Sequence, residues 1–166
     1  YVYDRHTHKL IEHKRSTLER GAIHVPEQLW RGDGFFRQPG YHIDLRNRLQ
    51  DHQHVVTVDI QVDRHLPPIQ AAFTVYEDLA RFQPLIAVLP VNDYRRPMYT
   101  HKAACPVEGR LQVGERTWSL AGGWALIDVQ KTFYPRDAFW KWAAFAGHDS
   151  AGVPLALNLT HKHDPG

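Results

Sequence analysis

The chain has 166 residues, of which 43% are hydrophobic and 23% charged, and 20 Lys and Arg residues against 18 Asp and Glu leave a formal net charge of +2. Five Trp residues and this apolar content are enough for a buried core, whereas so small a charge, with no basic run along one element, argues against nucleic-acid binding. The single cysteine, Cys105, excludes an intramolecular disulfide, and no stretch approaches the about eighteen apolar residues of a membrane-spanning helix.

The ends of the chain add two expectations. No amino-terminal segment has the layout of a signal peptide, which together with the lone cysteine favours a reducing cytoplasm. Because the chain begins at Tyr1 and its last predicted strand ends close to Gly166, we expect it to be part of a longer protein.

Short segments of the first half alternate apolar with polar residues. Residues 1–11 predict a hairpin with a polar tip, and Arg31 to Gly34 predict a turn. The Arg-Gly-Asp triplet in that turn is an integrin ligand in exported proteins, a role that the missing secretion signal does not support. Strands are predicted over residues 41–49, 56–62, 69–76 and 85–91, of which the last is nearly continuous in apolar residues. The clear period of two in 56–62 indicates one buried and one polar face.

The second half begins with a further hairpin. Residues 110–113 and 116–120 alternate around Gly114-Glu115, a spacing that predicts a two-residue turn with glycine at its first position. Gly122 and Gly123 then interrupt the pattern, as glycines do at a bulge or a sharp bend.

Asp128 directly follows an apolar run, residues 124–127. One interpretation is a residue that ends the strand and accepts backbone N–H bonds. The other is a carboxylic acid in an apolar pocket, where it could act as a general acid near neutral pH.

Residues 139–145 are rich in aromatic side chains, and Gly147 and Gly152 follow so soon that the segment is too short for a stable helix. As a strand they place Trp140, Trp142 and Ala144 on one face and Lys141 on the other. The two Trp residues could line an apolar cavity or fill a core.

Taken together, about nine to eleven strands, without a convincing long helix or a repeat, predict an all-β antiparallel barrel or sandwich. Twelve His residues include three His-x-His pairs, against about one pair expected by chance. No Cys or carboxylate cluster completes a ligand set at them, so we predict no metal site and no cofactor. Cys105 lies in a strand-like context and is predicted to be a small buried side chain rather than a nucleophile.

Several motifs of the second half occur in a characteristic order: Tyr-Thr-His-Lys, Pro-Val-Glu-Gly, the lone Asp128, Tyr-Pro-Arg, Trp-Lys-Trp and Leu-Asn-Leu-Thr. Over about residues 95–162 this order resembles domain-of-unknown-function family 2804, a bacterial family. More distantly it is similar to the lipocalin-like superfamily that holds carotenoid hydratases, the AttH proteins and lipocalin-type Diels–Alder cyclases.

The resemblance implies a pair of lipocalin-like antiparallel barrels with an apolar cavity, residues 1–94 belonging to a first barrel or inter-barrel region and residues 95–166 to a barrel segment. In the hydratase relatives an acidic residue after an apolar strand gives a proton to an alkene, and Asp128 matches it by position. The sequence here departs from the hydratases directly after Asp128, where Val129-Gln130-Lys131-Thr132 follow.

The leading functional hypothesis is therefore binding of a hydrophobic small molecule, lipid-like or isoprenoid-like, in a barrel cavity. The predicted lining is formed by His101, Lys102, Tyr134, Trp140, Trp142 and Asn158. The alternative is a lyase or isomerase acting on such a ligand with Asp128 as the proton donor. Two further interpretations stay open: Lys102 and Asp128 pair across the sheet while the aromatic residues form a core, or the domain has no ligand at all.

Overall fold

The computed structural model describes residues 1–15, 17–28, 31–91, 96–132 and 139–163. These residues form thirteen strands and one 3-10 turn, η1 (Leu49–Asp51), so the fold is all-β, as predicted. No helix among them has the length and apolar character to cross a membrane. They group into unit 1, Tyr1–Tyr76 with Val107–Gly123, and unit 2, Glu77–Pro106 with Trp124–Gly166.

The thirteen strands follow one another along the chain with short connections. They are β1 (Val2–Asp4), β2 (Lys9–Ile11), β3 (Ile23–His24), β4 (Arg31–Gln38), β5 (Tyr41–Arg48), β6 (Gln53–Ile60), β7 (Ile69–Tyr76), β8 (Leu85–Val91), β9 (Arg96–Val113), β10 (Arg116–Ser119), β11 (Gly123–Lys131), β12 (Phe139–His148) and β13 (Pro154–His163).

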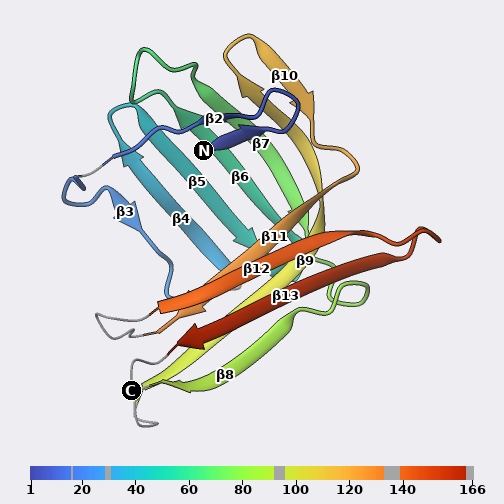
Figure 1. Cartoon of the computed structure of the whole chain (residues 1–166). Coiled ribbons are helices and arrows are strands. Elements are labelled where there is room, and N and C mark those ends of the chain that lie inside the picture. Colours follow the sequence, from blue (N-terminus) through green and yellow to red (C-terminus); the bar gives the residue numbers. More distant parts are fainter. Residues whose placement is uncertain (16, 29–30, 92–95, 133–138, 164–166) are drawn as a thin grey trace. The chain divides into compact units, whose positions relative to one another are not determined.

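Unit 1 is built on an antiparallel sheet whose strands β4 to β7 lie side by side in chain order (Figure 1). The carboxyl-terminal part of β9 pairs with β7, and β10 pairs with β9 through the tight turn at Gly114, where φ is +59°. The register aligns apolar residues on one face, because side chains two apart point the same way. Ile60, Ile69 and Val113 are the buried centre of that core.

The opposite face of the unit 1 sheet is polar. Arg37 pairs with Asp44 at 2.6 Å, and Arg48 pairs with Asp33 at 2.9 Å. Thr57 and Asp59 of β6 are also exposed on this side. The period of two in β6 therefore separates an apolar from a polar face, as the sequence predicted.

The amino-terminal hairpin β1–β2 is fastened to this sheet by polar contacts. Asp4 accepts hydrogen bonds from the backbone N–H of His6 and from Arg116, and these and other hydrogen bonds lower the pKa of its carboxyl group to about 2. Behind the hairpin, the buried His13 ring accepts from two backbone N–H groups at Nδ1, those of Val62 and Asp63. Its Nε2 bonds to the carbonyl oxygen of Pro67 at 2.9 Å, so one ring holds the amino-terminal segment against the connection between β6 and β7.

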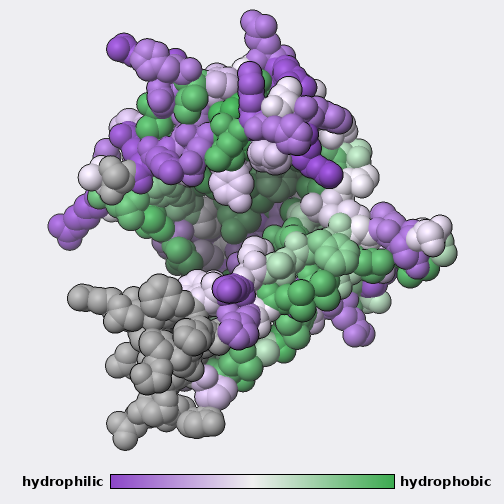
Figure 2. Space-filling view, viewed as in Figure 1, coloured by the Kyte–Doolittle hydropathy of each residue, from purple (hydrophilic) through white to green (hydrophobic). Residues whose placement is uncertain are grey.

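Unit 2 consists of β8, the amino-terminal part of β9, β11 and the long hairpin β12–β13 (Figure 1). Leu85 of β8 lies opposite Lys102 of β9, and Trp142 of β12 lies opposite Thr160 of β13. Figure 2 shows hydrophobic residues gathered over β12 and β13. The exposed apolar side chains of that hairpin include Phe145, Leu155, Leu157 and Leu159.

Most predicted strands are confirmed, and two local predictions are wrong. Arg31 to Gly34 do not form a turn but begin β4. Asp128 does not end a strand, because β11 continues to Lys131. A closed barrel is not confirmed, since no sheet of the described residues closes on itself. The division of the chain into two barrel parts at residue 94 stays a prediction.

Candidate functional site

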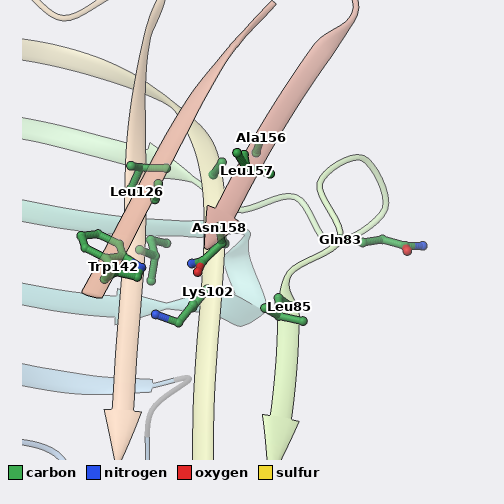
Figure 3. A pocket seen from close by; sticks show the side chains of 12 residues that line it. Gln83, Leu85, Lys102, Leu126, Trp142, Ala156, Leu157 and Asn158 are labelled. Carbon is green, nitrogen blue, oxygen red and sulfur yellow. The ribbon is translucent and has the colours of Figure 1, made fainter. Parts of the chain in front are cut away.

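Unit 2 contains a pocket of about 260 Å³ between the β12–β13 hairpin and the strands β8, β9 and β11 (Figure 3). Apolar residues make up most of its wall, and Lys102 and Asn158 are polar groups within it. Gln83 also borders the pocket, but in Figure 3 its side chain points away from the other labelled residues. The apolar lining consists of Leu85, Ala103, Ala104, Leu126, Ile127, Trp142, Ala144, Ala156 and Leu157.

Lys102 is the central polar residue of this pocket. Its side chain is only 10% exposed, and its Nζ lies 2.7 Å from Asp128 Oδ2. The same ammonium group lies 5.3 Å from the ring centroid of Trp142, within the range of a cation–π interaction. An ammonium group that leaves water needs such partners, so Asp128 and Trp142 together hold Lys102 in place.

Asp128 is the residue for which the sequence offered two roles. Its Oδ2 accepts a hydrogen bond from Lys102, and its Oδ1 accepts one from Gln130 at 3.2 Å. The ion pair that was predicted as an alternative is therefore present, although its companion expectation, a core of aromatic residues, is wrong for the two Trp residues of β12. Trp140 is 50% exposed and Trp142 is 45% exposed.

The hairpin register places Trp142, Ala144 and Asn158 on one face of the hairpin. Ala144 lies opposite Asn158, so both point to the same face as Trp142, two residues away. Trp140 shares that face by alternation, as predicted, but is not part of the pocket wall. Of the predicted binding residues, the structure thus brings Lys102, Trp142 and Asn158 together.

The remaining predicted residues lie elsewhere. His101 precedes Lys102 in β9, so its side chain points to the opposite face of the strand and does not line the pocket. Tyr134 lies outside the described residues.

Unit 2 also contains a buried polar residue, Glu77, that the sequence did not indicate. Glu77 is 1% exposed, and its Oε1 lies 2.5 Å from Nε2 of His101. The sequence next to Glu77 gives no signal of this pair, because Glu77 directly follows β7 and its partner is 24 residues further on. The predicted burial of Cys105 is confirmed, because its side chain is 0% exposed.

Cys105 should be unreactive in the folded protein. Burial, and to a lesser extent the charge of Glu77, raises the pKa of its thiol to about 12, so the thiolate that reacts with disulfide reagents is absent at neutral pH. We expect an aromatic disulfide reagent to modify no thiol in the native protein at pH 8 and one thiol per chain in guanidinium chloride. Stoichiometric modification of the native protein would contradict the buried position.

The raised pKa of Cys105 also makes the free energy of unfolding depend on pH. Because the folded-state pKa lies above the ordinary value of 9.0, the unfolded chain loses the thiol proton first as the pH rises. The contribution of Cys105 to the free energy of unfolding is therefore complete below about pH 9 and falls between about pH 9 and 12. A Cys105→Ala variant should lack this part of the alkaline decline in urea unfolding.

The histidine pairs do not form a metal site in the part of the chain that the structure describes. No three His, Cys, Asp or Glu side chains gather there with a suitable arrangement. His8 instead bonds to the hydroxyl of Tyr3, and His54 bonds to Asn47.

Comparison with known proteins places the chain in one family. No curated protein and no solved structure matches it. The family model described as "Domain of unknown function (DUF2804)" matches residues 1–165, which extends the resemblance of the second half to the first. Because the model covers nearly the whole chain, the protein belongs to the DUF2804 family.

Proposed function

We propose that unit 2 binds a hydrophobic small molecule in the pocket beside Trp142. The observation that carries the proposal is the lining itself, in which nine of the twelve residues are apolar and three are polar. Small-molecule sites typically combine an apolar wall with a few placed polar side chains in about 300–1,000 Å³. A volume of about 260 Å³ lies just below that range and suits a small ligand or one end of a longer one.

The exposed ring of Trp142 supports the same proposal. An aromatic side chain that remains 45% exposed beside a pocket has not been used to fill a core. A bound apolar molecule would remove part of that surface from water, at roughly 25 cal/mol per Å² of apolar area.

The alternative, a lyase or isomerase with Asp128 as the proton donor, finds less support. Both carboxylate oxygens of Asp128 already accept hydrogen bonds, one from Lys102 and one from Gln130. A proton donor would have to present an O–H group to the ligand instead. Asp128 is thus better suited to hold Lys102 than to protonate a ligand.

Native mass spectrometry of the protein purified from its native source tests both functions. We expect a retained apolar molecule in the wild type and in Asp128→Asn with the same mass, and a much smaller bound fraction in Trp142→Ala. Leu159→Ala, a change at an exposed hairpin residue that does not line the pocket, is the control and should retain the ligand.

Two results would contradict the binding proposal. Equal retention by Trp142→Ala and the wild type would place the ligand outside this pocket. A ligand whose mass differs between wild type and Asp128→Asn by the elements of water would instead favour catalysis by Asp128.

The lipocalin-like barrel belongs to the same proposal. It is supported by the family resemblance and by the antiparallel sheet of unit 1, which has one apolar and one charged face. A lipocalin-type barrel would present such an apolar face to its interior.

A further inference from the structure

The polar groups of the unit 2 pocket restrict the chemistry of its ligand. Lys102 has three N–H donors on its ammonium group, of which the described contacts use one in the bond to Asp128, while Trp142 interacts with the charge through its ring. No further acceptor for Lys102 is present among the described residues. At least one donor of Lys102 is therefore available to a molecule in the pocket.

Asn158 supplies a second donor from β13. Its Oδ1 accepts a hydrogen bond from the hydroxyl of Thr160 at 3.3 Å, and within the described part of the chain its Nδ2 has no acceptor. Figure 3 shows Lys102 and Asn158 among the side chains around the pocket. Lys102 and Asn158 thus both offer hydrogen-bond donors to the pocket. An oxygen atom on the ligand could accept hydrogen bonds from them.

The charges around the pocket make an uncharged ligand a better match than a charged one. Among the described lining residues only Lys102 is charged, and its charge is balanced by Asp128, which is not part of the wall. A carboxylate would leave one unbalanced negative charge in a mostly apolar site, and an ammonium group would meet the positive charge of Lys102. An uncharged oxygen accepts the hydrogen bonds without changing this balance.

We propose that the pocket takes an apolar molecule with one uncharged oxygen acceptor, a carbonyl or hydroxyl group, which accepts hydrogen bonds from Lys102 and Asn158. The inference rests on the proposed binding function and specifies its ligand class. Lys102 is then a specificity-determining residue, and Asp128 positions it.

Matched eight-carbon probes test the ligand class in the whole chain. Isothermal titration should give higher affinity for 2-octanone and 1-octanol than for octanoate and octylammonium, by about fivefold or more. In the paired variant Lys102→Met with Asp128→Asn, which removes both charges at similar size, affinity for 2-octanone should fall at least about tenfold, because hydrogen bonds to charged groups are the stronger ones. Asn158→Leu, which leaves the ion pair intact, should show a smaller loss, and Leu159→Ala none.

The outcomes separate this inference from the proposed function. If all four probes bind equally, or octanoate binds most tightly, the ligand class is wrong while the pocket remains a binding site. If Trp142→Ala leaves the affinity of every probe unchanged, or no probe binds, the proposed function itself fails. Unchanged 2-octanone affinity in both the paired variant and Asn158→Leu would also overturn the assignment of the donors.

Discussion

Gly109→Ala should destabilise the protein more than a Gly→Ala substitution at any other glycine in the described strands. At Gly109 φ is +135°, a backbone conformation that residues with a Cβ rarely adopt. A Cβ at this position would lie 2.3 Å from the backbone oxygen of Ala72 and 2.5 Å from Cα of Phe73. Both contacts involve the backbone of β7, so no side-chain rotation can relieve them.

The location of Gly109 makes this clash costly. The residue pairs with Phe73 in the β7–β9 ladder, and its carbonyl oxygen accepts a hydrogen bond from the N–H of Leu120. Backbone strain and overpacking each cost about 1–3 kcal/mol, and whole domains are stable by only about 5–15 kcal/mol. We therefore expect a loss of about 2–6 kcal/mol in urea unfolding followed by Trp fluorescence.

Gly147→Ala is the matched control because Gly147 also lies within a strand. A Cβ there would meet nothing within 4 Å, and its φ is outside the positive region. Its free energy of unfolding should equal that of the wild type or rise by about 0.4–1 kcal/mol, since alanine restricts the unfolded chain more than glycine does. Equal stability of both variants would show that β9 does not approach β7 as closely as described.

Strands with a clear local pattern of apolar residues were the part of the fold that the sequence alone could predict. The strands at Ile69–Tyr76 and Leu85–Val91 have the predicted bounds, and the turn at Gly114 joins the predicted pair of strands. Each signal is local: Ile69–Tyr76 has apolar residues at a period of two, and Leu85–Val91 is a short, nearly continuous apolar run.

The wrong prediction at Arg31 to Gly34 shows where local signals fail. Two glycines in four residues are typical of a turn, but here they lie within β4 beside Pro26. A Cβ on Gly32 would lie 2.9 Å from Cβ of Pro26, so the glycine leaves room for a neighbouring segment rather than for a turn. The sequence contains no sign of that neighbour, since the contact depends on the tertiary fold.

The candidate site was partly predictable for the same reason. Trp142 was predicted from residue type and alternation and Lys102 as a polar lining residue, and the structure brings both to one pocket. His101, the next residue along β9, was named with them, although alternation puts it on the opposite face. Glu77 was missed because a single glutamate after a strand has no local pattern, and only the fold shows its partner.

Glu77→Ala should be strongly destabilising because it removes one partner of a buried pair. Glu77 is 1% exposed and His101 is 8% exposed, with 2.5 Å between Oε1 and Nε2. Truncating one member leaves a buried polar group without the hydrogen bond that compensated for its lost hydration. Such changes cost about 3–5 kcal/mol, which urea unfolding measures directly.

A solvent-exposed pair offers the control. Glu12 lies 3.0 Å from Nζ of Lys14, whose side chain is 77% exposed, so Glu12→Ala should cost at most about 1 kcal/mol. The double-mutant cycle of Glu77→Leu and His101→Leu should then show coupling of about 0.5–3 kcal/mol, with the double variant more stable than the sum of the single losses predicts. Additive losses would mean that the two side chains stabilise the protein independently, and the short contact between them would then contribute nothing of its own to the fold.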